Sequence, residues 1–253
     1  MVPLTHQIWK HITREAKDHL SREPYALFLQ HLILDRTDFA DALAAILATR
    51  LNNCLIGEKD LQSLLRAEIS AHGSIAESAA YDLQAVVDRD PAASTYLEPF
   101  LFFKGFQALQ AHRIAHSLWK KGRQFPALMI QSIVSQKLDV DIHPAAQIGK
   151  GILMDHATNV VIGETAVIGN NVSILHGVSL GGTGKERGDR HPKIADGVMI
   201  GAHAQLLGNI RIGKGAKIGA GAVVLADVPA HTTVAGIPAV RVGKPQVQMP
   251  ALD

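Results

Sequence analysis

Aliphatic residues recur every six positions through the C-terminal half of the chain. The longest unbroken run begins at Ile194 and continues through Ile200, Leu206, Ile212, Ile218 and Val224. Two shorter six-residue registers precede it, one over residues 142–154 and one over residues 162–180. Neither the period of a helix nor that of a strand gives this spacing, whereas one inward aliphatic residue per short strand does. The pattern predicts a parallel β-helix of roughly five stacked coils, each closed by three strands around an aliphatic core.

The N-terminal half has a helical pattern instead. Apolar residues recur at helical spacing over residues 39–51, with Asp38 or Thr37 placed to cap the segment. A longer helix is predicted to begin at Ser94, with Phe102, Phe106 and Leu109 along one side and Gly122 placed to end it.

The amino-acid composition changes between these two halves. All twelve aromatic residues lie at or before Phe125, whereas eighteen of the 22 glycines lie at or after Gly149. A stacked aliphatic core has no room for aromatic side chains, which explains the division. We therefore expect an α+β fold with an α-helical N-terminal domain over residues 1–139. A β-helix domain over residues 140–240 and a C-terminal tail over residues 241–253 complete the predicted chain.

Composition also excludes several classes of protein. Lys and Arg number 25 against 23 Asp and Glu, and no basic stripe alternates with aromatic residues, so nucleic acid is not an expected partner. The single Cys54 rules out an internal disulfide, and the first residues lack the basic and apolar regions of a signal peptide. No stretch approaches the ~18 consecutive apolar residues of a membrane span. The expected location is the cytoplasm.

Two interruptions break the six-residue repeat. One is a two-residue slip between Met154 and Ile162, and the other is a longer break over residues 181–193, rich in glycine and cations. A solenoid extrudes extra residues as loops, often on its binding face, so we expect the functional site at these breaks. The string at 182–185 suggests a phosphate loop, but Glu186 stands where Ser or Thr should follow the lysine, which excludes that interpretation.

Three strings carry a family resemblance: residues 139–144 (DVDIHP), residues 154–158 (MDHAT), and GGTG at 181–184 followed by GDRHPK at 188–193. With them the chain resembles the serine O-acetyltransferases of the hexapeptide-repeat acyltransferase superfamily. The resemblance implies a left-handed β-helix that trimerises and then pairs through its helical domains into a hexamer. It also implies a reaction in which acetyl-CoA and L-serine give O-acetyl-L-serine and CoA. This reaction is the first step of cysteine biosynthesis from serine, and L-cysteine is expected to inhibit it at the serine site.

Acetyl transfer to a hydroxyl needs a base, because the alcohol of serine stays protonated at neutral pH. His156 in the first interruption is the predicted base, since a neutral imidazole dominates at cytoplasmic pH and can later protonate the departing thiolate. By resemblance, Asp141 is the carboxylate that orients this imidazole, a role known from hydrolytic triads. The residues themselves do not distinguish Asp141 from Asp139.

The resemblance implies the contacts to serine residue by residue. Arg190 and His191 match the pair that binds the substrate carboxylate, and a planar guanidinium suits that role because it can bind both oxygens. Asp155 and Asp90 match the residues that hold the amine, although Asp90 also fits an ordinary helix cap.

CoA contacts are implied in the same way. The backbone at Gly182, Thr183 and Ala202 is expected along the pantetheine arm, in a groove between neighbouring subunits. Lys217, with Lys214 as a further candidate, is expected at the nucleotide phosphates. Acetyl-CoA is a co-substrate here, and neither a permanently bound cofactor nor a metal is expected.

Three other functions fit parts of the sequence. A zinc enzyme of the γ-carbonic anhydrase type would take His ligands from adjacent coils, but its pair of His five residues apart is absent. A hexapeptide acyltransferase acting on a sugar fits the repeat but not the helical domain or the 190–191 string. A mainly regulatory protein would dock its C-terminus into the next enzyme, O-acetylserine sulfhydrylase. That docking uses a terminal isoleucine, whereas this chain ends in Asp253.

His112 and His116 have the spacing of a metal motif. Arg113 occupies the Glu position of His-Glu-x-x-His, so the pair is expected on a solvated helix face.

Overall fold

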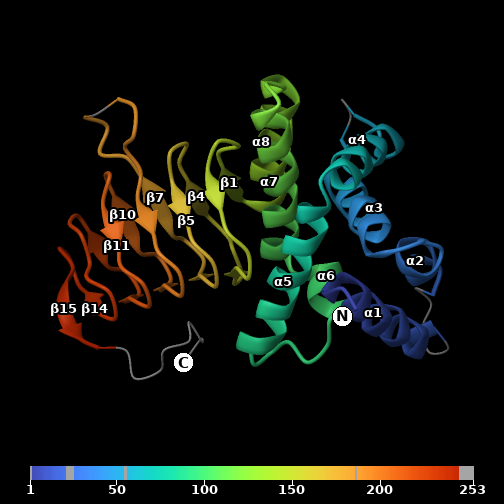
Figure 1. The fold of residues 1–253 in the computed structure, drawn as a ribbon, viewed down its shortest axis with the longest axis horizontal. Coiled ribbons are helices and arrows are strands. Elements are labelled where there is room, and N and C mark those ends of the chain that lie inside the picture. Colours follow the sequence, from blue (N-terminus) through green and yellow to red (C-terminus); the bar gives the residue numbers. More distant parts are fainter. Residues whose placement is uncertain (1, 21–25, 54–55, 186, 245–253) are drawn as a thin grey trace.

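The computed structural model describes residues 2–20, 26–53, 56–185 and 187–244. Its helices come first in the chain and its strands follow, as Figure 1 shows. The helices are α1 (Leu4–Leu20), α2 (Ala26–Leu29), the π-helix η1 (Gln30–Leu34), α3 (Phe39–Leu51), α4 (Glu58–Ala71), α5 (Gly73–Arg89), α6 (Leu97–Phe102), α7 (Lys104–Lys120) and α8 (Gln124–Leu138). Within the described residues, no helix is long and apolar enough to cross a membrane.

The strands form three faces of a parallel β-helix. Face A contains β1 (Val140–Ile142), β4 (Val160–Ile162), β7 (Ser179–Gly181), β10 (Gln205–Leu207) and β13 (Val223–Val224). Face B contains β2 (Gln147–Ile148), β5 (Val167–Ile168), β8 (Lys193–Ile194) and β11 (Arg211–Ile212). Face C contains β3 (Leu153–Met154), β6 (Ser173–Ile174), β9 (Met199–Ile200), β12 (Lys217–Ile218), β14 (Thr233–Ala235) and β15 (Val240–Gly243). Among the strands of the described residues, only β15 runs antiparallel to its neighbour, and it continues past residue 240, the predicted end of the β-helix domain.

The six-residue repeat is confirmed by the pairing register. On face C, Met154 lies beside Ile174, which lies beside Ile200, and Ile218 follows in the next coil. All four side chains are buried, and the same stacking occurs on the other faces. The predicted inward aliphatic residues therefore form the core.

The two sequence interruptions lengthen two coils. A regular coil places Gln205 beside Val223, eighteen residues later. The first coil instead pairs Val140 with Val160, twenty residues later, and the coil with the long break pairs Ser179 with Gln205, twenty-six residues later. The extra residues therefore leave the solenoid at two places: the corner between faces C and A, called the C–A corner, and the corner between faces A and B, called the A–B corner.

Helices α5, α7 and α8 pack on the first coil and join the two parts of the chain (Figure 1). At this junction Arg113 of α7 forms a 2.7 Å ion pair with Asp82 of α5, which is fully buried. The same guanidinium donates to the carbonyls of Ile148 and Gly149, and Asp82 accepts from the Ile152 N–H. Helices and coil therefore share one polar contact inside a continuous apolar core.

Some of the helical predictions hold and others are wrong. Asp38 caps α3, where its side chain accepts from the Asp41 N–H. The helix predicted over residues 94–122 is two helices, α6 and α7, because Phe103 has an extended backbone between them. Phe106 and Leu109 are buried on α7, whereas Phe102 ends α6 with 58% of its surface exposed, so the three residues do not share one side of a single helix.

The prediction that His112 and His116 lie on a solvated face is also wrong. His112 is buried, and the Nδ1 of His116 lies 2.8 Å from the Pro144 carbonyl oxygen of the first coil. The helix face that carries them packs against the β-helix, which the helical spacing of α7 alone does not reveal.

Candidate active site

Three predicted site residues line one pocket of about 430 Å³ at the C–A corner. Asp155 and His156 reach it from the turn after β3, and Asp90 reaches it from the end of α5. His156 Nε2 lies 3.8 Å from Asp155 Oδ2, and the His156 side chain is 75% exposed. The pocket therefore places an accessible imidazole beside two carboxylates.

The two extra residues of the first coil shape this corner. They allow a tight turn in which His156, Ala157 and Asn159 all have positive φ angles. The Asn159 N–H donates to the Asp139 carbonyl, which closes the turn onto the end of α8. The result is an imidazole that projects outward from the solenoid, where a substrate can reach it.

Helix α7 approaches the same corner through Gly105. A Cβ atom on this residue would lie 2.0 Å from the Met154 carbonyl oxygen and 3.0 Å from the Ala157 Cβ. The glycine is therefore needed for the start of α7 to form the wall of the pocket opposite His156. Lys104 and Phe103, which the sequence analysis did not single out, line the pocket because of this contact.

The electrostatics of the pocket favour a cationic ligand. Burial raises the pKa of the Asp155 carboxyl above its ordinary value; His156 opposes this effect, and the negative charge of Asp90 adds to it. An ammonium group placed between the two carboxylates would relieve both the repulsion and the loss of solvation. Asp90 also accepts from the Ala92 N–H, so its side chain both supports the local turn and lines the pocket.

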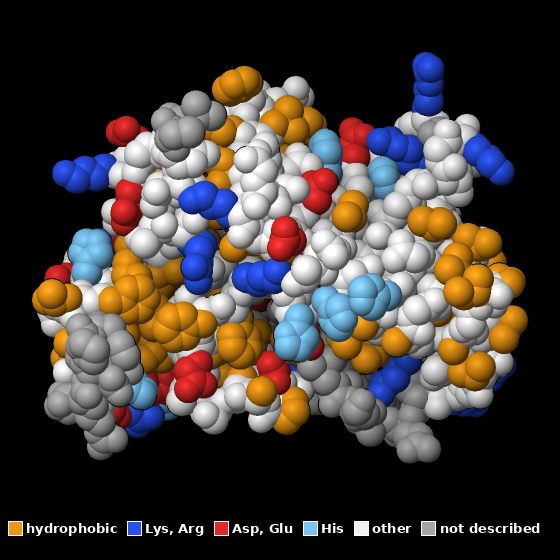
Figure 2. Space-filling model, turned by 180° about the vertical axis from the view of Figure 1, so that it is seen from behind, with side chains coloured by type: hydrophobic (Ala, Val, Ile, Leu, Met, Phe, Trp, Pro, Cys, Tyr) orange, Lys and Arg blue, Asp and Glu red, His pale blue; other side chains and the backbone are white. Residues whose placement is uncertain are grey.

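A ladder of imidazoles runs along the C–A corner. The rings of His156 and His176 are 5.8 Å apart, and those of His176 and His203 are 4.8 Å apart, both edge to face. Figure 2 shows His side chains side by side on one face of the molecule. In the described part of the chain, no three His, Cys, Asp or Glu side chains are arranged to hold a metal ion.

Asp141 lies away from this ladder within a single chain. It is the outward residue of β1 on face A, between two buried neighbours, and it accepts a 2.7 Å hydrogen bond from Gln131 of α8. Among the described residues, the carboxylate nearest to His156 is that of Asp155.

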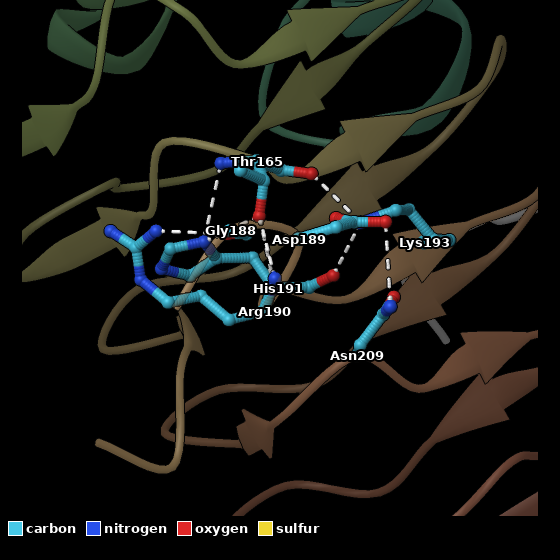
Figure 3. A network of polar contacts seen from close by, with 7 residues as sticks. All are labelled: Thr165, Gly188, Asp189, Arg190, His191, Lys193 and Asn209. Carbon is cyan, nitrogen blue, oxygen red and sulfur yellow. Dashed lines mark hydrogen bonds and ion pairs between the residues drawn. The ribbon is translucent and has the colours of Figure 1, made fainter. Parts of the chain in front are cut away.

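Arg190 and His191 lie at the A–B corner, in the long loop. The Thr165 N–H donates to His191 Nδ1, so the neutral ring carries its proton on Nε2 (Figure 3). Burial lowers the pKa of His191, and the charges of Arg190 and Lys193 lower it further, which keeps the ring neutral. The donor that the neutral ring offers is therefore Nε2–H, which packs against Gly163 in a ring that is 7% exposed.

The guanidinium of Arg190 is held in place on one side. It donates to Glu164 at 2.9 Å and to the Gly188 carbonyl at 3.0 Å, which uses two of its five N–H groups. The remaining donors can bind a substrate carboxylate. Thr165 supports the whole loop, since its hydroxyl accepts from the backbone N–H groups of Arg190 and His191 (Figure 3).

The sequence analysis missed Thr165 and Glu164. The repeat could have predicted the position of these two residues, because Ile162 and Leu180 occupy the same position in successive coils. The turn after Ile162 must then lie directly beside the long loop.

The predicted CoA residues are divided between the same two corners. Gly182 and Thr183 begin the loop at the A–B corner, and Gly208 of the next coil lies against Thr183. Ala202 lies at the C–A corner beside His203, where its carbonyl accepts from the Gly221 N–H. Lys217 stands at the start of β12 on face C and is half-buried.

Comparisons with known proteins agree with this geometry. A family model described as serine acetyltransferase, N-terminal, matches residues 8–111, and one described as bacterial transferase hexapeptide (six repeats) matches residues 191–226. Serine acetyltransferase of Escherichia coli (strain K12) is 51% identical over 247 residues, which cover 97% of this chain and 90% of that protein.

This chain belongs to the serine acetyltransferase family. It is therefore an acyltransferase. Solved structures of the family have the same fold: soybean serine acetyltransferase complexed with serine matches with a TM-score of 0.93 and 50% identity, over 96% of this chain and 100% of that one. Serine acetyltransferase from Brucella abortus strain S19 in complex with coenzyme A matches with a TM-score of 0.93 and 46% identity. The match covers 94% of this chain and 96% of that one.

In this serine acetyltransferase family member, one chain carries two separate parts of the candidate site. His156, Asp155 and Asp90 lie at the C–A corner, whereas Arg190 and His191 lie at the A–B corner. Strand β4 separates the corners, and its three residues span roughly 10 Å. Within one chain, the two groups of side chains therefore lie at opposite ends of β4.

Proposed function

We propose that this enzyme transfers the acetyl group of acetyl-CoA to the hydroxyl of L-serine, giving O-acetyl-L-serine and CoA. The observation that carries the proposal is the pocket in which the exposed His156 imidazole stands beside the Asp155 and Asp90 carboxylates. This arrangement offers a base next to a binding place for an ammonium group. The serine and CoA bound in the solved relatives support the choice of substrates.

The proposed chemistry needs one proton acceptor. The imidazole of His156 removes the serine hydroxyl proton while the oxygen attacks the thioester carbonyl. The tetrahedral intermediate then collapses, the carbon–sulfur bond breaks, and the CoA thiolate leaves with the proton taken back from His156. Orientation of this imidazole is assigned to Asp141 by resemblance to the family, and Gln131 donates to one oxygen of this carboxylate.

A second copy of the chain completes the serine site in this proposal. Arg190 and His191 of a neighbouring chain would bind the substrate carboxylate while Asp155 and Asp90 bind its ammonium group. The separation of the two corners by β4 supports this arrangement, and the trimer expected for the family would supply it. CoA would lie in the same groove, along Gly182, Thr183 and Ala202 and with Lys217 at its phosphates.

We also place the reaction at the start of cysteine biosynthesis from serine, with L-cysteine as an inhibitor. Cysteine has the same ammonium and carboxylate groups as serine, so it would compete for the same carboxylates and guanidinium. The predicted contact with O-acetylserine sulfhydrylase concerns the chain end at Asp253, which lies outside the described residues.

The test is a steady-state assay of CoA release from acetyl-CoA. Release that depends on L-serine, survives exhaustive chelation and yields O-acetyl-L-serine by mass spectrometry is the expected result. Well-folded protein that releases CoA only with a sugar acceptor, or that hydrates bicarbonate in a chelator-sensitive way, would overturn the proposal.

A further inference from the structure

Two histidines of the C–A corner, His176 and His203, have no part in the proposed proton transfer. They follow β6 and β9, as His156 follows β3, so the three rings occupy the same corner in successive coils. Their centroids are 5.8 Å apart in the first step and 4.8 Å in the second. Both steps are close to the ~4.8 Å spacing of neighbouring strands. The rings therefore form a row along the solenoid that begins at the proposed base.

The middle ring, that of His176, is half-buried between its two neighbours. Its Nδ1 atom is buried and has no hydrogen-bond partner among the described residues. A buried N–H without an acceptor is rarer than a buried acceptor without a donor, so the neutral ring carries its proton on Nε2. Packing on both sides fixes the ring, and the ring in turn sets the separation between His156 and His203.

The last ring, that of His203, is exposed but held in a fixed place. The backbone of this residue has a φ of 60°, and its N–H donates to the His176 carbonyl at 2.8 Å. A Cβ atom on Gly177 would overlap His203 Nδ1, so the ring lies directly over the Gly177 backbone. Gln205 donates to the His203 carbonyl at 3.2 Å. The corner therefore presents an accessible imidazole at a set distance from the proposed base.

The surroundings leave one direction for a long molecule that reaches His156. On the helical side the start of α7 closes the corner, because Gly105 packs on the turn after β3. On the other side lie His176 and His203, and the same corner of the next coil, residues 219–222, contains only glycine and alanine. An acyl donor with its thioester at His156 therefore extends away from the helices, past these two rings.

We infer that His203 binds the pantetheine arm of the acyl donor and selects for donors that carry its second amide. This inference rests on the proposed acetyl transfer from acetyl-CoA. In an extended arm, the carbonyls of the first and second amides lie about 6 Å and about 11 Å from the thioester carbonyl. These distances match one and two steps along the row of rings. An imidazole N–H donates to an amide carbonyl, so His203 is placed for the second one.

The chain offers a matched control for His203 at a different corner. His231 is also exposed, has a φ of 51°, and donates its backbone N–H to the Lys214 carbonyl at 2.9 Å. Its ring lies over Gly215, where a Cβ atom would be 2.8 Å from Nδ1. However, His231 follows the bridge of Val228 to face B and precedes β14 of face C. It therefore has the local conformation of His203 without its place beside the proposed site.

The test compares three acetyl donors on the full chain, with L-serine as acceptor. Acetyl-CoA and S-acetylpantetheine contain both amides, whereas S-acetyl-N-acetylcysteamine ends after the first. The variant is His203→Gly, because glycine adopts a positive φ without strain. With the two longer donors, kcat/KM should fall about 3- to 10-fold, as expected for one lost neutral hydrogen bond, and with the short donor by less than about twofold. His231→Gly should match the unmodified chain with every donor.

Binding of CoA, measured by isothermal titration calorimetry without serine, gives a readout that does not depend on activity. His203→Gly should weaken it about 3- to 10-fold, and His231→Gly should not. An equal loss of kcat/KM with all three donors would indicate a merely structural role and overturn the inference, as would unchanged CoA affinity in His203→Gly. Failure of the proposed function differs from both results. It would appear in the unmodified chain as no serine-dependent release with any donor, while CoA binding would still test His203.

Discussion

At the scale of single residues, the pocket around His156 combines a reactive imidazole with a carboxylate that is costly to keep charged. Asp155 is half-buried and lies near both Asp90 and His156. Because its pKa is raised in the folded state, the folded protein holds a proton there more tightly than the unfolded chain does. The contribution of Asp155 to stability therefore falls as the pH rises through its raised pKa.

Replacing the Asp155 carboxylate should raise the stability of the protein and lower its activity. Asp155→Asn is expected to raise the free energy of unfolding at neutral pH relative to the unmodified chain, with a smaller difference in acid. It should lower kcat/KM for serine by about 10- to 100-fold, because a charge-assisted hydrogen bond to the substrate ammonium is lost. Urea unfolding at two pH values and steady-state kinetics check both parts. An Asn variant that is less stable than the unmodified chain at pH 7 would contradict the account.

The chemistry of these residues was more predictable than their surroundings. His156 and Asp155 were assigned from their string and Asp90 from the family resemblance, and the structure brings all three into one pocket. Glu164 and Phe103 were not assigned, because each reaches its place through packing between segments that are distant in the sequence. No periodicity along one segment carries that information.

At the scale of elements, the decisive contact is the start of α7 against the turn after β3. Gly105→Ala is expected to destabilise the protein by about 1–3 kcal/mol, because its new methyl group would overlap the Met154 carbonyl. The same change at Gly73, the first residue of α5, meets nothing within 4 Å and serves as the control. Thermal unfolding of both variants gives the comparison. Equal stability of Gly105→Ala and Gly73→Ala would show that the close approach is unimportant.

The buried ion pair between α5 and α7 makes a second prediction at this scale. Asp82→Asn or Arg113→Met alone should cost about 3–5 kcal/mol, since each leaves a buried charge without its partner. The double variant Asp82→Asn/Arg113→Met should cost less than the sum of the two single losses, because no unpaired charge remains in it. Lys150→Ala, which removes an exposed ion pair with Glu77, is expected to change stability by less than about 1 kcal/mol. Chemical denaturation of the four variants tests the set, and additive losses in the double variant would argue against a coupled pair.

The elements themselves were unequally predictable. The six-residue spacing gave the coils and both interruptions, because each inward position has one neighbour above and one below. The break at Phe103 and the burial of His112 were missed, because both depend on how α6 and α7 meet the first coil. Helical periodicity identifies the apolar face of a helix. It does not show whether the polar face is solvated or packs against another part of the protein.

At the scale of the whole molecule, the candidate site is divided between two corners of one chain. The proposed base His156 and the proposed amine-binding carboxylates lie at the C–A corner, and Arg190 and His191, proposed to bind the substrate carboxylate, lie at the A–B corner. Such a division is productive only if chains associate so that different corners meet. The sequence strings contained four of the five residues, all but Asp90, and the repeat alone did not reveal that they occupy different corners.

The most direct test of this account uses two inactive variants. His156→Ala lacks the base, Arg190→Ala lacks the carboxylate-binding guanidinium, and each alone should lose nearly all serine-dependent CoA release. Co-expressed with different affinity tags and purified through both, they should regain about a quarter to a third of the normal activity, because some interfaces then pair an intact His156 with an intact Arg190. Mixed oligomers that stay as inactive as either variant would contradict a site shared between chains.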